Sequence, residues 1–318
     1  MTDTPETLVT AVTYFSDPKV CFEAMLGVKW PDGIVTCPKC HGEEVGVITS
    51  RQMLQCKNKD CRKQFSVKVG TIFEDSPLPL QKWFVGIWLI ANAKNGISSC
   101  ELGRALGTTQ KTAWFMLHRI RLAMKTGTFR KLSGTVESDE TFIGGKAKNM
   151  HKKVREKKIR GRGTVSKAIV QGLLEREGEV RMQVVGNTDD LTLQGTVRKH
   201  VEPGSHVYTD ALPAYGGLAL GYIHKFVDHL TQYVKDNVVH TNGLENFFSL
   251  LKRMLKGTYV AVAPFHLDRY LDEETFRFNE RDTNDAGRFG IALSRVVGKR
   301  LTYRVLTATD DAGFMGIK

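Results

Sequence analysis

Four cysteines near the N-terminus restrict the possible folds of this chain more than any other feature. Cys37 and Cys40 form one closely spaced pair, Cys56 and Cys61 form a second, and fifteen residues separate the two pairs. The first ten residues lack the basic and apolar regions of a signal peptide, and no apolar run reaches transmembrane length. We therefore expect a cytoplasmic protein, in which such pairs bind a metal rather than form disulfides.

The spacing of these pairs predicts a zinc ribbon with a structural zinc ion. Four thiolates complete the tetrahedral shell of Zn²⁺ and leave no open position for a substrate. A short amphipathic helix over residues 18–26 and a strand over residues 65–69 complete the expected module, which we place at residues 1–75. Cys21 and Cys100 lie outside the spacing and are expected to be small buried hydrophobic residues.

Residues 76–130 have the periodicity and turn residues of a helical module that binds DNA. A helix over residues 98–106, a turn at Gly107 and a second helix from Thr109 resemble a helix-turn-helix. The polar start of the second helix is typical of a recognition helix, whose N-terminal residues face base edges. The expected DNA contacts are Thr109, Gln110, Lys111 and Arg119. The alternative is a plain helical bundle that links two domains.

A β-prone stretch over residues 134–143 carries an aspartate where a strand would meet an exposed turn. Strand-forming residues lie on both sides of Asp139, and Gly144 with Gly145 then interrupts the pattern. Residues 146–167 follow as a strongly basic run, which is either a solvated loop or a segment that closes over DNA phosphates. We interpret Asp139 as a catalytic residue.

Two later stretches supply companions for Asp139. Residues 206–210 form a strand-like run that ends in Asp210, and a helix with apolar residues at helical spacing follows residue 240. Asn242 is expected to cap that helix, with Glu245 three positions on as in a capping box. Lys252 lies seven residues beyond Glu245, hence on the same helical face.

Three carboxylates from two strands and a helix would provide the oxygen ligands that Mg²⁺ prefers. A pair of such ions activates a nucleophile and stabilises the leaving oxygen in phosphodiester chemistry. In the alternative, each acid is ordinary: Asp139 is a solvated strand end, Asp210 is a turn residue and Glu245 only completes a capping box.

Three of these motifs resemble the core of zinc-ribbon DDE transposases from small bacterial insertion sequences. The motifs are VESDETFIGG, VYTDALPAY and HTNGLENFFSLLKRMLKGTYV, and RFNERD and GKRLTYRVLT resemble the C-terminal ends of that family; the likeness spans residues 14 to 307. It implies an α/β, RNase H-like mixed sheet with flanking helices, over residues 131–285, that cuts and joins DNA. Residues 286–318 are expected to form a C-terminal tail.

The resemblance also assigns roles to residues. Asp139 and Asp210 become the first two magnesium ligands, and manganese is an equivalent ion. Relatives have either glutamate or asparagine at the third position, so Glu245 is the expected catalytic ligand and Asn242 is its competitor. Lys252 matches the basic partner of the family and is expected to contact DNA.

The composition agrees with a polyanionic partner, because the net charge is +12 and the sequence pI is about 9.4. The resemblance implies a DNA transposase of the bacterial nucleoid, which acts on terminal inverted repeats and target DNA as a homodimer or higher oligomer. Two alternatives stay open. One is a non-enzymatic zinc-ribbon and helix-turn-helix DNA-binding protein, and the other is a structure-selective nuclease on the same fold.

Overall fold

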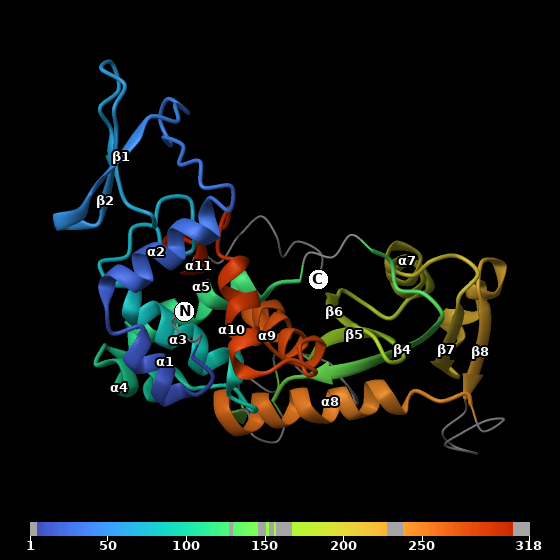
Figure 1. Cartoon of the computed structure of the whole chain (residues 1–318). Helices are drawn as coiled ribbons and strands as arrows, with labels where there is room; N and C mark the ends of the chain where they lie inside the picture. Colours follow the sequence, from blue (N-terminus) through green and yellow to red (C-terminus); the bar gives the residue numbers. More distant parts are fainter. Residues whose placement is uncertain are drawn as a thin grey trace. The chain divides into compact units, whose positions relative to one another are not determined.

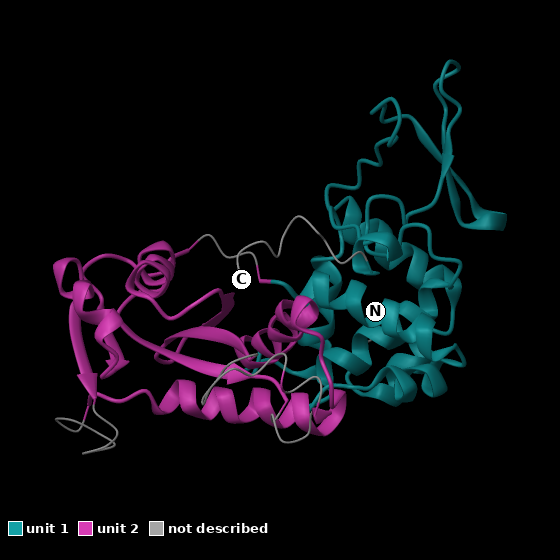
Figure 2. Ribbon diagram, turned by 180° about the vertical axis from the view of Figure 1, so that it is seen from behind, with its two compact units in different colours: residues 1–125, 280–308 teal, residues 126–279, 309–318 magenta. Residues whose placement is uncertain are grey.

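The computed structural model describes residues 5–126, 130–145, 151–152, 156, 167–227 and 238–307. The chain divides into two compact units, one of residues 1–125 and 280–308 and one of residues 126–279 and 309–318 (Figure 2). Most of the basic run over residues 146–167 lies outside the described residues. Within the described ranges, no helix has the length and apolar character that crossing a membrane requires.

The first unit begins with two helices and a small antiparallel sheet. α1 (Leu8–Tyr14) starts at a capping box, and α2 (Pro18–Lys29) starts at an aspartate cap followed by proline. The sheet follows and consists of β1 (Val45–Ile48), β2 (Met53–Cys56) and β3 (Gln64–Phe65), with the 3₁₀ turn η1 (Thr49–Arg51) between the first two strands. The strands lie in the order β1-β2-β3. The expected strand over residues 65–69 is wrong beyond Phe65, because the chain turns back there and the Val69 N–H bonds to the Ser66 carbonyl.

Three helices form the centre of the first unit: α3 (Leu80–Asn92), α4 (Ser99–Leu106) and α5 (Gln110–Met124). Trp83, Phe84 and Trp88 on α3 are at most 2% exposed and are its three large buried aromatic side chains. Gly107 ends α4 in the left-handed region with φ of 59°, which glycine adopts without strain. The two helices and the turn between them therefore lie where the sequence predicts.

Two further helices of this unit come from the C-terminal segment. α10 (Asp285–Ser294) and α11 (Tyr303–Thr307) occupy residues that the sequence suggests are a tail. The ring of Phe289 on α10 lies 5.5 Å from Trp88 and 5.0 Å from Phe15, centroid to centroid. Residues 286–307 therefore include part of the aromatic core of the first unit.

A five-stranded mixed sheet organises the second unit, with strand order β6-β5-β4-β7-β8 (Figure 1). The strands are β4 (Thr135–Ile143), β5 (Ala168–Glu175), β6 (Val180–Val185), β7 (His206–Asp210) and β8 (Ile223–Val227). β5 is antiparallel to both β4 and β6, whereas β4, β7 and β8 run parallel. The mixed sheet with flanking helices confirms the fold class expected from the sequence.

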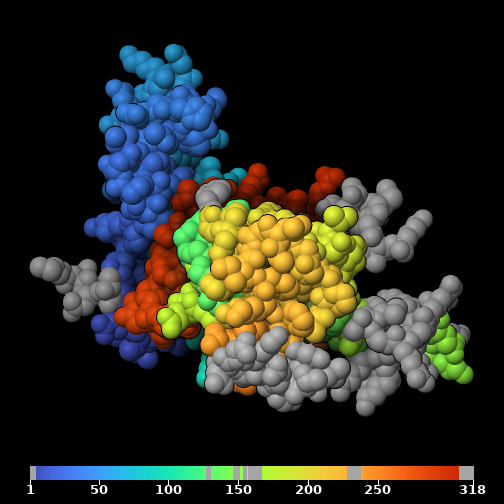
Figure 3. Space-filling model, turned by 90° about the vertical axis from the view of Figure 1, so that its right-hand side faces the viewer, coloured from blue at the N-terminus to red at the C-terminus, as the bar shows by residue number. Residues whose placement is uncertain are grey.

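Helices cover both faces of this sheet. One face is covered by α8 (Asn242–Met254), the π-helical turn η4 (Leu255–Tyr259), the short η5 (Pro264–His266) and α9 (Leu267–Asn279). The buried residues of these helices form a core with those of β5 and β6. α7 (Asp190–His200) and η3 (Pro213–Leu220) form a second core on the opposite face. Figure 3 shows a side of the molecule on which the yellow to light orange part of the second unit, which includes η3 and β8, lies at the surface.

Candidate active site and metal centre

β4 presents Asp139 at a point where the sheet opens. β4 pairs with β5 along its whole length, but it pairs with β7 only over residues 135–137. Beyond Glu137 the β7 side of β4 is therefore unpaired, and the end of β7 places Asp210 next to that gap. Ligands commonly bind at the carboxyl ends of parallel strands, where neighbouring strands diverge in this way.

The structure brings Asp139 and Asp210 together, and it adds Glu140, which sequence reasoning missed. One carboxylate oxygen of each residue lies within 4.8 Å of the others, and all three side chains are half-buried. Tyr215 from η3 donates a hydrogen bond to the Glu140 carboxylate, and Ser138 lies 2.9 Å from the same phenol oxygen. Neighbours in a strand point to opposite faces, so adjacency to Asp139 alone did not suggest a shared site.

α8 brings Glu245 and Lys252 to the same place. A cavity of about 520 Å³ is lined by the β4 residues Asp139, Glu140 and Thr141, and from α8 and η4 by Glu245, Phe248, Ser249, Lys252, Arg253 and Lys256. Among the described residues its lining includes Glu245 and not Asn242. The cavity therefore has acids on the strand side and a mixture of one acid and several bases on the helix side.

The electrostatics of this cluster favour a bound cation. Burial, reinforced by the negative charges of Asp210 and Glu245, raises the pKa of Asp139 to about 7, although Lys252 acts in the opposite direction. Burial also raises the pKa of Glu140 to about 8, and the charges of Asp139 and Asp210 add to that effect. Ionising carboxylates that are crowded in this way costs free energy unless a bound cation balances their negative charge.

The start of α8 differs from the expected capping box. Thr241 is the N-cap and its side chain makes no cap hydrogen bond, while Asn242 is the first helical residue and is exposed. The N–H of Leu244 instead donates to the carboxylate of Glu137, a buried residue of β4, at 3.0 Å. A partner this distant in sequence replaces the expected local cap.

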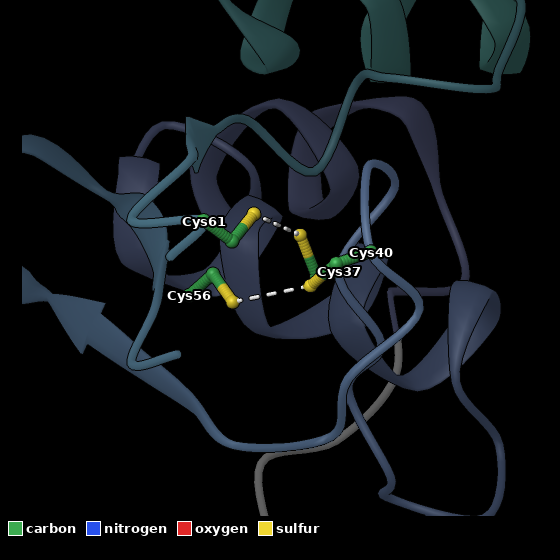
Figure 4. Close-up of side chains that lie close together, drawn as sticks. All are labelled: Cys37, Cys40, Cys56 and Cys61. Carbon is green, nitrogen blue, oxygen red and sulfur yellow. Dashed lines mark hydrogen bonds between the residues drawn. The ribbon is translucent and has the colours of Figure 1, made fainter. Parts of the chain in front are cut away.

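The four cysteines form a second candidate metal centre, in the first unit. Their sulfurs point toward a common centre (Figure 4), with Sγ–Sγ distances of 3.7 Å between Cys37 and Cys61 and 3.6 Å between Cys40 and Cys56. A tetrahedron with Zn–S of about 2.3 Å requires roughly 3.8 Å between ligands, so the arrangement fits structural zinc. Cys21 is fully buried as expected, whereas the expectation of a buried Cys100 is wrong, because it lies exposed on α4.

The expected DNA contacts on α5 fall into two groups. Thr109, Gln110 and Lys111 are exposed at the start of the helix, where Thr109 also accepts a hydrogen bond from the Thr112 N–H as the N-cap. Arg119 is not on the exposed surface of the helix as the sequence suggested. It is only 4% exposed, and its guanidinium donates to the backbone carbonyls of Ile72, Glu74 and Leu301. These bonds give Arg119 a structural role in holding α5 against the neighbouring backbone.

Comparisons with known proteins agree with this geometry. Residues 131–279 match the family described as the ISXO2-like transposase domain, and residues 16–64 match the transposase zinc-ribbon domain. The chain is also 27% identical, over 240 residues, to an uncharacterized protein in transposable element ISH50 of Halobacterium salinarum, covering 72% of this chain and 80% of that protein. No solved structure matches the chain.

Proposed function

We propose that this chain, which belongs to the zinc-ribbon transposases with an ISXO2-like DDE domain, cleaves and joins DNA at the ends of its element by metal-dependent phosphodiester chemistry. The observation that carries the proposal is the grouping of Asp139, Glu140 and Asp210 beside a helix that presents Glu245 and Lys252. Carboxylate oxygens at this spacing are suited to Mg²⁺ or Mn²⁺.

Asp139 and Asp210 would hold the metal, and Glu245 would complete the site. When bound, a pair of Mg²⁺ ions supplies an activated water or 3′-hydroxyl and stabilises the leaving oxygen. Burial and the neighbouring acids raise the pKa of Asp139 to about 7, so a cation held by this residue would favour its ionised form. Lys252, on the wall of the same cavity, would bind a phosphate oxygen and orient the strand.

Glu245 is our choice for the third ligand, and Asn242 is the alternative. Glu245 lines the cavity and is close enough to Asp139 to raise its pKa. A carboxylate also binds Mg²⁺ better than an amide does. Asn242 occupies the first position of α8, one turn before Glu245, and remains the residue to test against it.

The first unit would bind the ends of the element. A zinc ribbon at residues 1–75 and a helical module at residues 76–130 would contact the terminal inverted repeats, with Thr109, Gln110 and Lys111 at base edges and phosphates. Holding two ends for joining requires at least two copies of the chain. We place this activity on the bacterial nucleoid.

Cleavage and joining of a labelled DNA that carries the element's end tests the proposal. With Mg²⁺, the wild-type protein is expected to nick and then join this DNA, whereas Asp139→Ala and Asp210→Ala bind it without cutting. Comparing Glu245→Ala with Asn242→Ala identifies the third ligand. Activity that survives Asp139→Ala or Asp210→Ala contradicts the assignment.

Two other wild-type outcomes would replace the proposal with a different function. Cutting without joining would indicate a nuclease, and tight binding without metal-dependent nicking would indicate a non-enzymatic DNA-binding protein.

A further inference from the structure

A buried carboxylate connects the start of α8 to the strand that carries Asp139. Glu137 lies two residues before Asp139 on β4 and is 1% exposed. Its Oε2 accepts the Leu244 N–H from the first turn of α8 at 3.0 Å, and its Oε1 accepts from Arg176 Nε at 2.9 Å. One carboxylate therefore satisfies a free N–H at the helix start and an arginine at the same time.

Arg176 extends this connection to the chain that leads into α8. It follows β5 directly, and its Nη2 donates both to the carbonyl oxygen and to Nδ1 of His240, each at 3.0 Å. Its guanidinium also lies over the ring of Tyr208 on β7, 5.0 Å from the centroid. Arg176 thus contacts β4, β7 and His240, the residue before the N-cap of α8.

The first turn of α8 lies so close to the sheet that a Cβ at residue 243 would force its neighbours to move. A Cβ there would lie 2.8 Å from Glu137 Oε2 and 2.5 Å from Leu174 Cδ2. Because both neighbours are buried or nearly so, neither has room to retreat. Gly243, Glu137 and Arg176 therefore fix where α8 begins relative to β4, and we name these three residues the helix bracket.

We infer that the helix bracket positions the third metal ligand for the reaction. Glu245 is one residue beyond Leu244, whose N–H the bracket holds, and Asp139 is two residues beyond Glu137. The bracket therefore sets the separation between an acid on the helix and an acid on the strand. The inference rests on the proposed function, and none of the three bracket residues is assigned as a metal ligand.

The far end of α8 offers matched controls. Glu273 on α9 is fully buried, pairs with Arg277 at 2.6 Å and accepts at 2.7 Å from the hydroxyl of Tyr259, which ends η4 beyond α8. It therefore resembles Glu137 in chemistry and burial. Gly257 on η4 has open space where a Cβ would lie. Glu273→Gln and Gly257→Ala thus test general effects on the fold without disturbing the start of the helix.

Binding of Mn²⁺ to the full-length protein, measured from the free-ion EPR signal, tests this inference without requiring activity. Gly243→Ala and Arg176→Gln are expected to weaken Mn²⁺ binding about tenfold or more, the range seen when groups supporting metal ligands are lost. In Arg176→Gln the two possible effects on Mn²⁺ affinity have opposite signs. Loss of a nearby positive charge would strengthen Mn²⁺ binding, whereas loss of the positioning of Glu245 would weaken it. Gly257→Ala and Glu273→Gln should retain the wild-type affinity.

Hydrogen exchange of the peptide over residues 241–248 provides a second measurement. Faster exchange is expected in Arg176→Gln and Gly243→Ala and not in Gly257→Ala, because only the first two loosen the start of the helix. Wild-type Mn²⁺ affinity in Gly243→Ala and Arg176→Gln would overturn the inference, as would an equal loss in Gly257→Ala. If the wild type binds Mn²⁺ through Asp139 but never cuts DNA, the proposed function fails while the bracket stands.

Discussion

At the scale of single residues, ionisation of the half-buried Asp139 and Glu140 opposes the stability of the metal-free fold. The pKa of Asp139 is raised to about 7 by burial and by its acidic neighbours, whereas in an unfolded chain an aspartate ionises near pH 4. The unfolded state therefore releases its proton first as the pH rises. The free energy of unfolding falls between about pH 4 and pH 7 for this reason.

Asp139→Asn is expected to stabilise the metal-free protein at pH 8 by roughly 1–3 kcal/mol and to have little effect at pH 4, where Asp139 is already protonated in the fold. Urea unfolding in the presence of a chelator, at the two pH values, measures the difference. Asp189→Asn is the control, because this exposed N-cap of α7 has a lowered pKa and its ionised form is favourable. Equal stability of wild type and Asp139→Asn at pH 8 would contradict the prediction.

Asp139 and Asp210 were noticeable in the sequence because an acid within or directly after a strand-forming run is unusual. Asp210 does end β7, but the expected exposed turn at Asp139 is wrong, because β4 continues through Asp139 to Ile143. Glu140 and Glu137 could not be found in this way. Their roles depend on Tyr215, 75 residues away, and on Leu244, 107 residues away, which only the folded sheet brings near. Arg119 was misplaced because helical spacing does not reveal that this turn of α5 faces the core.

At the scale of elements, α8 depends on a small residue in the strand beneath it. A Cβ on Gly172 of β5 would lie 2.8 Å from Leu244 Cδ2 and 3.2 Å from Phe248 Cε1. Leu244 and Phe248 belong to the apolar face that the spacing predicted, and both are buried. The helix itself was therefore predictable from the sequence, but its close approach to β5 was not.

Gly172→Ala should destabilise the second unit by about 1–3 kcal/mol, because an extra methyl forces packed side chains apart. The free energy of unfolding, from denaturant titration followed by circular dichroism, measures this loss. Gly195→Ala in the interior of α7 is the matched control, since a Cβ at that residue would have nothing within 4 Å and alanine favours a helix. The packing explanation fails if both variants have the stability of the wild type.

At the scale of the whole molecule, each of the two compact units has its own group of potential metal ligands: four cysteines in the first unit and three carboxylates in the second. The cysteine pairs were predictable because their spacing is local, and the structure brings all four thiols together. The role of residues 286–307 was not predictable, because Phe289 packs with Phe15 and Trp88 from the opposite end of the sequence.

The purified protein is expected to contain one zinc ion per chain, and Cys61→Ser should lose it together with DNA binding. Metal analysis by mass spectrometry and a filter-binding assay measure the two properties. Cys100→Ser, which removes an exposed cysteine outside the cluster, should keep both. The zinc assignment is wrong if Cys61→Ser retains a stoichiometric zinc ion.

The discontinuous first unit also has a consequence for synthesis. Residues 126–279 hold the complete five-stranded sheet and its helices, whereas the first unit needs residues 280–307 for α10 and α11. A ribosome releases the chain from the N-terminus onward, at about 5–20 residues per second. The five-stranded sheet can therefore form before Phe289, which completes the aromatic core around Trp88, has been synthesised. The first unit therefore begins before the second in the chain, yet its last two helices are synthesised after all the strands of the second unit.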